Sequence, residues 1–396
     1  MKTTTIGKIA DVQTGPFGSQ LHKEDYVTNG TPIVTVEHLG QKTFTTQNLP
    51  CVSAKDKVRL AKYTMRTGDI IFSRVGSVDR CSFATENNDG WLFSGRCLRL
   101  RVADVDVNSE YLYYYFCQEA VKELIRNHAV GATMPSLNTK LLNELPFSYP
   151  GKEQQTKIVS LLSDIDAKIE RNASINQNLE AQAEALFDKH FGPRQSIVGE
   201  KGKAEQFFEI NIGKTPPRKE HEWFSDNPTD VTWVSISDMG TCGMYILESS
   251  EYLTKEAVER FNIKVVPTDS ILLSFKLTVG RVAIADSPLT TNEAIAHFKY
   301  SDPAIREFLY FYLKKYDYQT LGSTSSIATA VNSKMIKSLP FTMPDADTLK
   351  GFHRTCAPLF DAIRLAQHET IRLAALRDTL LPKLMSGEID VSEIEV

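Results

Sequence analysis

Six glycine-containing loops of this sequence carry basic, amide and hydroxyl side chains. They span 15–23, 73–80 and 131–136 in the first half, and 212–219, 276–281 and 322–326 in the second half. Arginine and lysine neutralise phosphates or bond guanine, glutamine bonds adenine, and hydroxyl groups bond phosphate oxygens. Polar loops also occur on any protein surface, so each loop alone is a weak indication. The candidate DNA-binding residues are Ser19, Gln20, Lys23, Arg74, Ser77, Arg80, Thr133, Lys214, Thr215, Arg218, Lys276, Thr278, Arg281, Ser323 and Thr324.

No catalytic motif accompanies these loops. The sequence has no GxxxxGK[ST] phosphate loop, no GxGxxG, no [ND]PP[YF] and no HExxH, and its eight histidines are scattered. The segment 344–350 superficially resembles a nuclease motif, but acidic residues there suit a helix start, which they cap. We therefore expect a non-catalytic protein without a metal site, although composition leaves a Ser/His/Asp set open.

The chain contains an internal duplication. Leu145–Pro150 (LPFSYP) recurs as Leu339–Pro344 (LPFTMP), at an offset of 339 − 145 = 194 residues, and Asn138 matches Asn332. Fainter matches join 31–40 to 231–240 and 68–84 to 269–285, where we expect strands and turns. Aromatic runs at 111–116 and 308–313 could stack on bases, but helical core packing is the favoured interpretation.

Two long amphipathic helices follow the two repeated blocks. Apolar residues recur in heptad spacing from Ile158 to His190, and the same offset places a second such stripe from Phe352 to Leu384. Each stripe needs a partner, and the simplest is the other helix in antiparallel orientation. Asn172 and Asn176 would then lie in the seam near Ala366 and Thr370, either fixing its register or remaining solvated. The predicted seam residues are Ile158, Leu162, Ile165, Ile169, Leu179, Leu186, Leu359, Ile363, Leu373 and Leu380.

These features predict four segments. They are a first block (1–147), a first long helix (148–193), a second block (194–341) and a second long helix (342–396). The expected fold is α+β, or mixed, with two pseudo-symmetric α/β blocks separated by two long antiparallel, coiled-coil-like helices. Pro358 should kink the second helix or delay its start.

Composition narrows the class of protein. The 396 residues are 42% hydrophobic and 24% charged, which is ordinary for a soluble protein, and no apolar run approaches a membrane span. Six well-separated cysteines and an N-terminus without an apolar signal core favour a cytoplasmic protein with reduced thiols. The net charge of −4 is unusual for a free-standing nucleic-acid binder, so DNA binding would use local basic loops or be shared with partners.

Over essentially its full length the chain resembles the specificity (S) subunit of Type I restriction–modification enzymes. The resemblance rests on the two variable blocks, each followed by Leu-Pro-Phe and a long helix. It also rests on segments 15–21, 73–77, 145–158 and 380–389. One departure is the second helix entry, where 345–350 lacks the Glu-Gln pair of the first.

The resemblance implies a DNA-recognition subunit of a methyltransferase and endonuclease complex. Each block would be a target-recognition domain for one half of a bipartite site in double-stranded DNA. The helix pair would set the spacer and dock two modification subunits. S-adenosylmethionine, ATP and Mg would be bound by the modification and restriction subunits, and no cofactor by this chain. The alternatives are a coiled-coil protein–protein scaffold without direct DNA readout, and an enzyme with an unrecognised site.

Overall fold

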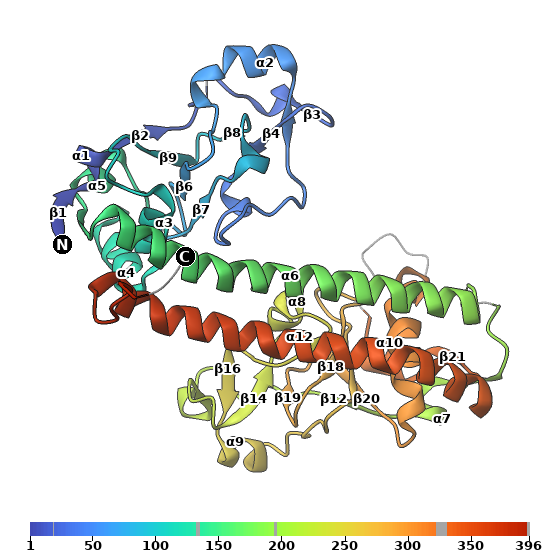
Figure 1. Cartoon of the computed structure of the whole chain (residues 1–396). Helices are drawn as coiled ribbons and strands as arrows, with labels where there is room; N and C mark the ends of the chain where they lie inside the picture. Colours follow the sequence, from blue (N-terminus) through green and yellow to red (C-terminus); the bar gives the residue numbers. More distant parts are fainter. Residues whose placement is uncertain (19, 132–134, 194–195, 322–330, 394–396) are drawn as a thin grey trace. The chain divides into compact units, whose positions relative to one another are not determined.

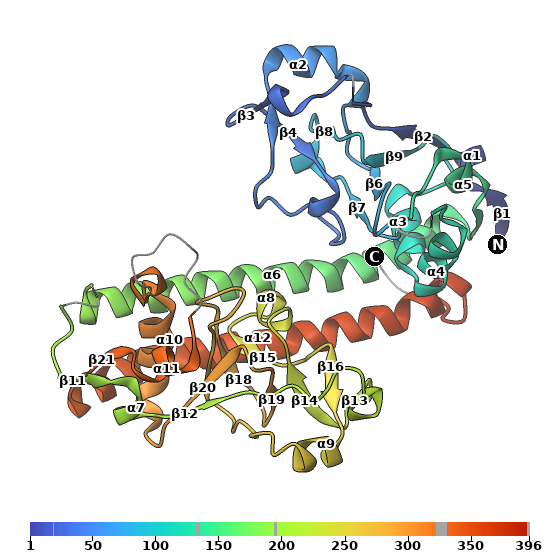
Figure 2. The ribbon, with the colours of Figure 1, turned by 180° about the vertical axis from the view of Figure 1, so that it is seen from behind.

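The computed structural model describes residues 1–18, 20–131, 135–193, 196–321 and 331–393. Contacts between Cα atoms divide the chain into two compact units, 1–168 with 373–396, and 169–372. The two long helices, α6 (Lys152–Phe191) and α12 (Ala346–Ser386), each contribute one part to both units (Figures 1 and 2).

The first block contains two four-stranded sheets and a strand pair. The central sheet has the order β2-β9-β6-β7, and a smaller sheet has the order β3-β5-β4-β8. These strands are β2 (Ala10–Thr14), β3 (Tyr26–Val27), β4 (Thr31–Val34), β5 (Cys51–Val52), β6 (Ile70–Ser73), β7 (Cys81–Phe83), β8 (Leu92–Phe93) and β9 (Cys97–Val102). Strand β1 (Lys2–Thr5) pairs with β10 (Pro146–Tyr149) and so joins the two ends of the block. The helices are α1 (Ile6–Ile9), α2 (Ala54–Arg59), α3 (Ser109–Cys117), α4 (Glu119–His128) and α5 (Thr139–Glu144).

The second block repeats this topology with one added edge strand. Its sheets have the orders β12-β20-β17-β18-β15 and β13-β16-β14-β19, and β11 pairs with β21 as β1 does with β10. These strands are β11 (Glu200–Lys203), β12 (Glu209–Ile212), β13 (Phe224–Ser225), β14 (Val231–Val234), β15 (Tyr245–Ile246), β16 (Glu251–Leu253), β17 (Ile271–Ser274), β18 (Val282–Ala285), β19 (Thr290–Thr291), β20 (Ile295–Lys299) and β21 (Pro340–Met343). The helices are α7 (Ala204–Phe207), α8 (Asp238–Thr241), α9 (Lys255–Arg260), α10 (Arg306–Lys314) and α11 (Ser333–Lys337). The matching strand orders confirm the predicted pseudo-symmetry of the two blocks.

The repeated sequence positions have the same local roles in both blocks. The side chain of Asn138 caps α5 by accepting from Leu141 N at 2.9 Å, and Asn332 caps α11 by accepting from Met335 N at 3.1 Å. The central strands β6 and β17 are buried along their whole length, which explains their continuous apolar sequences.

The aromatic helices α3 and α10 lie in the cores of their blocks. Tyr111, Tyr114 and Phe116 are buried in the first core, and every residue from Phe308 to Leu313 is buried in the second. The core-packing interpretation of both aromatic runs is therefore confirmed, and base stacking by these buried rings is ruled out.

The two long helices are antiparallel where they meet within each unit. In the first unit, Asp166 of α6 bonds Arg377 of α12 at 2.8 Å, while Lys157, nearer the start of α6, bonds the Ser392 carbonyl beyond α12. In the second unit, the buried Asn172 amide donates to Glu369 at 2.7 Å. Asn172 is thus a buried polar residue of the seam, next to the predicted partner position at Thr370.

The buried stripe of the helices departs from the strict heptad. Ile158, Leu162 and Ile363 are buried, and Ile165, Ile169, Leu179, Leu186, Leu359, Leu373 and Leu380 are half-buried. The expectation for His190 is wrong, because it is exposed while Phe187 and Phe191 on either side are buried. Both phenylalanine rings pack against Phe308 of α10, so this part of α6 faces the core of the second block as well as α12.

The starts of the two helices are held differently. Gln155 is completely buried, and its side chain bonds Asn108 N, Asp106 O and Pro150 O at 2.8–2.9 Å. In α12 the Asp345 carboxylate instead accepts from Asp347 N and Thr348 N, which is an ordinary N-cap. Of the two effects expected of Pro358, a delayed helix start is wrong, because α12 begins at Ala346 and continues past Pro358. A kink at Pro358 stays a prediction.

A buried acid ties α6, α12 and the first block together in the first unit. Asp166 is 5% exposed and lies 2.6 Å from the Tyr114 hydroxyl, 2.8 Å from Arg377 and 3.8 Å from Lys42. Burial and the neighbouring Asp166 carboxylate both raise the pKa of Tyr114. Tyr114 therefore remains a neutral donor to Asp166.

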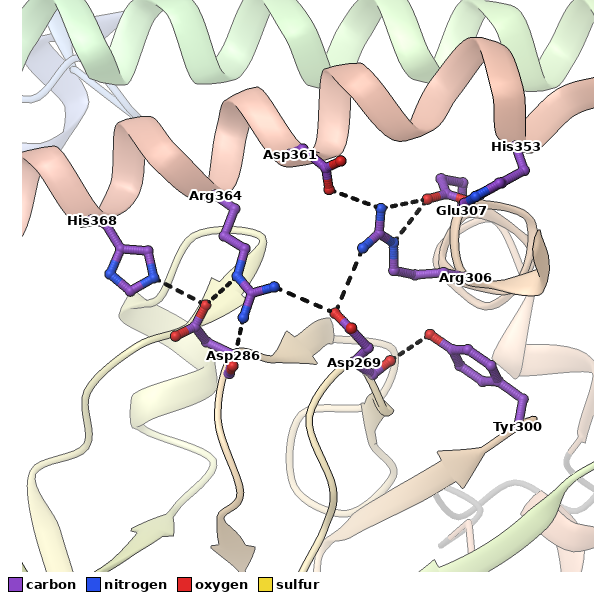
Figure 3. Close-up of polar contacts among 9 residues, drawn as sticks. All are labelled: Asp269, Asp286, Tyr300, Arg306, Glu307, His353, Asp361, Arg364 and His368. Atoms are coloured by element: carbon purple, nitrogen blue, oxygen red, sulfur yellow. Dashed lines mark hydrogen bonds and ion pairs between the residues drawn. The ribbon is translucent and has the colours of Figure 1, made fainter. Parts of the chain in front are cut away.

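A larger ion network attaches α12 to the second block (Figure 3). Arg364 of α12 bonds Asp286 at 2.5 Å, and His368 approaches the same carboxylate at 3.1 Å. Arg306 of the block lies 2.8 Å from Glu307 and 3.1 Å from Asp361 of α12. These groups alternate in charge along the contact between α12 and the block, so they fix which face of the helix is covered.

Candidate nucleic-acid interface

Two hairpin loops, one in each block, are built alike. The β6–β7 loop (74–80) follows Ser73, and the β17–β18 loop (275–281) follows Ser274; both serines are buried. Each serine hydroxyl donates to a carbonyl of its own loop, Ser73 to Val75 at 2.8 Å and Ser274 to Thr278 at 2.6 Å. Each serine N–H also donates to the carbonyl of the arginine that ends the loop, at 2.9 Å in both blocks. Candidates that fall in corresponding loops of the sequence therefore occupy corresponding places in the fold.

The arginines that end the two loops pack on equivalent glycines. A Cβ on Gly40 would lie 3.3 Å from Arg80 Cδ, and one on Gly240 would lie 2.5 Å from Arg281 Nη1. Arg281 also donates to the Ile236 carbonyl at 2.8 Å and is half-buried, whereas Arg80 is exposed. Only Arg80 of this pair presents its side chain openly to solvent.

Arg74 contacts Phe17 and Gly95, two residues that line a cleft in the first block. Its guanidinium carbon is 5.1 Å from the ring centre of Phe17, which is 54% exposed, and it approaches the Gly95 carbonyl at 3.4 Å. The cleft has a volume of about 550 Å³ and is lined by Phe17, Tyr26, Thr35, Glu37 and Arg96, among others. Arg96 is not among the sequence-predicted DNA contacts, although its context Ser-Gly-Arg has the same composition as the six candidate loops.

The other described candidates of the first block differ in their surroundings. Gln20 is exposed, but its side-chain oxygen accepts from the Tyr63 hydroxyl at 2.6 Å and its carbonyl accepts from Arg59. Lys23 and Ser77 are exposed. Lys23 and Ser77 therefore offer more accessible polar groups than Gln20 does.

Three candidates of the second block are engaged within the block itself. The Lys214 ammonium donates to the Phe261 carbonyl at 2.7 Å, at the end of α9. Arg218 forms a two-fold ion pair with Glu251 at 2.6 and 3.0 Å and stacks on Phe224 and Trp233.

The hydroxyl of the third, Thr215, bonds the Glu293 carboxylate. Burial would raise the pKa of Glu293, but this hydrogen bond and one from the backbone lower it, so Glu293 stays charged. Lys214, Thr215 and Arg218 thus have structural partners, and they would have to exchange these contacts to bind DNA.

The β17–β18 loop contains the accessible candidates of the second block. Lys276 and Thr278 are exposed, as is Leu277 between them. With Ser77 and Arg80 in the equivalent loop, they form the pair of polar hairpin tips that the sequence duplication predicts. Ser19, Thr133, Ser323 and Thr324 lie outside the described residues.

No metal centre or membrane span is present in the described part of the chain. Across the described ranges, no group of three or more His, Cys, Asp or Glu side chains could hold a metal ion. None of the helices found there is long and apolar enough to cross a membrane. All six cysteines, which belong to the described residues, are free thiols.

The fold and the loops define a protein with two equivalent candidate binding surfaces on one chain, joined by a helix pair. Comparison with known proteins identifies the family. A family model described as Type I restriction modification DNA specificity domain matches residues 1–181 and 200–365. The chain belongs to this family.

Individual relatives agree with the family assignment. The chain is 24% identical to the Type I restriction enzyme HindI specificity subunit of Haemophilus influenzae, over 85% of this chain and 90% of that protein. It is 28% identical to the MjaIX specificity subunit of Methanocaldococcus jannaschii, over 73% and 71%. The crystal structure of a Type I restriction–modification S subunit from M. genitalium has the same fold, with a TM-score of 0.55 at 16% identity over 97% of this chain and 95% of that one.

Proposed function

We propose that this chain is the DNA sequence-specificity subunit of a Type I restriction–modification complex and that each block contacts one half of a bipartite site. The β6–β7 loop binds one half and the β17–β18 loop the other. Exposed Ser77, Arg80, Lys276 and Thr278 supply contacts to phosphates and base edges.

The observation that carries this proposal is the repeated geometry of the two loops. Both are fixed by a buried serine and end in an arginine seated on a glycine. A protein that recognises two DNA segments needs two such surfaces, whereas a scaffold that binds other proteins has no need for matched basic tips. The acidic net charge of −4 is compatible with DNA binding if partner subunits contribute part of the positive surface.

The helix pair is proposed to set the spacer between the half-sites and to bind the modification subunits. Antiparallel pairing, with the buried Asn172–Glu369 hydrogen bond, supports a fixed register. Leu365 and Leu376 of α12 are 66% and 48% exposed. Leu365 belongs to the second unit and Leu376 to the first, and each is an exposed apolar side chain of α12 that suits a contact with a partner subunit.

The chemistry of the complex is assigned to those partners. Modification subunits would carry S-adenosylmethionine, and restriction subunits would use ATP and Mg. This chain is proposed to hold no cofactor and to contribute positioning of the DNA through its exposed polar loops.

Methylation by the complex assembled with the modification subunit tests the proposal. A library of DNA sites is methylated with the wild-type chain, with S77A/R80A and with K276A/T278A. Each double variant should relax base preference in one half-site, a different one for each, and leave the other unchanged. Lys55→Ala, at an exposed lysine of α2 that belongs to neither hairpin loop, serves as the control. Equal loss at both half-sites from either double variant would contradict the two-surface proposal.

A further inference from the structure

One position of the equivalent β6–β7 and β17–β18 loops has very different residues in the two blocks. The third residue after the buried serine, which is Ser73 in the first block and Ser274 in the second, is Gly76 in the first block and Leu277 in the second. Both have a left-handed backbone, with φ of +75° and +61°. The backbone requirement is therefore shared, but only the first block meets it with the residue that adopts this conformation freely.

The side chain of Leu277 makes no apolar contact within the described part of the chain that would offset the cost of its backbone conformation. A left-handed conformation costs a non-glycine residue about 1–2 kcal/mol, and apolar burial is what normally offsets such a cost. Leu277 is 95% exposed, so its side chain buries almost no surface within the chain. Exposed Lys276 and Thr278 flank it. An apolar group held out between polar residues at a loop tip is suited to an apolar feature of the ligand that the loop binds.

We propose that Leu277 is a specificity-determining contact of the second block and that its methyl groups touch the C5-methyl of a thymine in the major groove. This inference rests on the proposed function of the β17–β18 loop. Among the base edges of the major groove, the thymine methyl is the apolar group, and apolar side chains recognise it. Glycine at the equivalent position leaves the first block without this contact, so the two half-sites differ at that point.

Deoxyuridine provides the test, because it pairs as thymine does but lacks the methyl group. Each thymine of both strands in the second half-site is replaced in turn, and binding is measured for the complex with the modification subunits. At one position the wild-type chain should lose roughly fourfold in affinity, the value of one buried methyl. L277G and L277N should bind the thymine and deoxyuridine sites equally, and V58A, which trims an exposed valine on α2, should behave as wild type.

The two variants keep folding separate from recognition. Glycine and asparagine tolerate the left-handed conformation, so L277G and L277N should unfold at the same temperature as wild type or higher. Wild-type sensitivity at one thymine that both variants lose supports the proposal. The proposal is overturned if wild type and variants respond alike at every position, or if the second half-site has only G·C pairs. It is also overturned if L277G weakens binding to all sequences equally, because Leu277 would then act as a nonspecific wedge. In each of those cases K276A/T278A still reports whether the loop contacts DNA, so failure of the proposed function is seen separately.

Discussion

The buried carboxylate of Asp166 should hold α6 and α12 to the first block. Removing it in D166A leaves the Tyr114 hydroxyl without the acceptor at 2.6 Å and Arg377 without its partner at 2.8 Å. Breaking a buried ion pair by removing one member costs about 3–5 kcal/mol. Arg377 is 29% exposed in its side chain and keeps Asp378 nearby, so the lower end, about 3 kcal/mol, is expected.

Hydrogen exchange measures this loss locally, which is preferable because two units need not unfold together. Amides of α3 and of residues 373–386 should exchange at least a hundredfold faster in D166A than in wild type, since about 1.4 kcal/mol corresponds to tenfold. D164A is the matched control, because Asp164 lies on the same helix but is exposed. The reasoning is refuted if D166A exchanges no faster than D164A in these segments.

Three further predictions concern the second unit and the helix pair. His297 is completely buried, and burial lowers its pKa to about 3. The unfolded chain takes up a proton near pH 6.5 and the folded one does not, so the second unit should lose about 2 kcal/mol of stability between pH 7.5 and 5, and H297Q should flatten this acid limb of a thermal unfolding series. R364M, which removes the ion pair of Arg364 with Asp286, should cost about 2 kcal/mol of exchange protection in 346–372. R354M, at an exposed site on the same helix, should cost little. Inserting seven residues between 172 and 173 of α6, and seven between 368 and 369 of α12, preserves the heptad and lengthens the helix pair by about 10 Å. The spacer of the methylated sites should then be about three base pairs longer. An unchanged spacer would exclude the helices as its determinant.

The sequence predicted the duplication, and the structure shows that matched positions have the same local role in both blocks. Asn138 and Asn332 cap equivalent helices, and the serine that begins each hairpin loop is buried in the same way. These residues satisfy their hydrogen bonds within a few positions of themselves. A duplication at constant offset therefore preserved both the sequence signal and the structure.

Contacts between residues that are far apart in the chain could not be predicted from the sequence. A heptad count assumes that α6 packs against one helix only, and on that assumption His190 lies in the seam. In the structure Phe187 and Phe191 pack against Phe308 of α10 instead. Arg218 has the composition of a DNA contact, but its pairing with Glu251 follows from strands that meet only in the fold.

The two hairpin loops contain both residues whose exposure could be predicted from the sequence and one whose exposure could not. Arg80 and Lys276 are predicted DNA contacts because they are basic residues in glycine-containing loops, and both are exposed. Leu277 has no such signal in the sequence, because leucine residues are most often buried. Both its exposure and its left-handed backbone conformation are properties of the folded loop.

The most direct test of the central claim is a genome-wide map of methylated adenines made by the wild-type chain co-expressed with its modification subunit. Two blocks that each recognise their own DNA segment predict one bipartite motif, with two different specified halves separated by an unspecified gap of constant length. A single continuous motif, or two halves at variable separation, would contradict two recognition surfaces held by one helix pair.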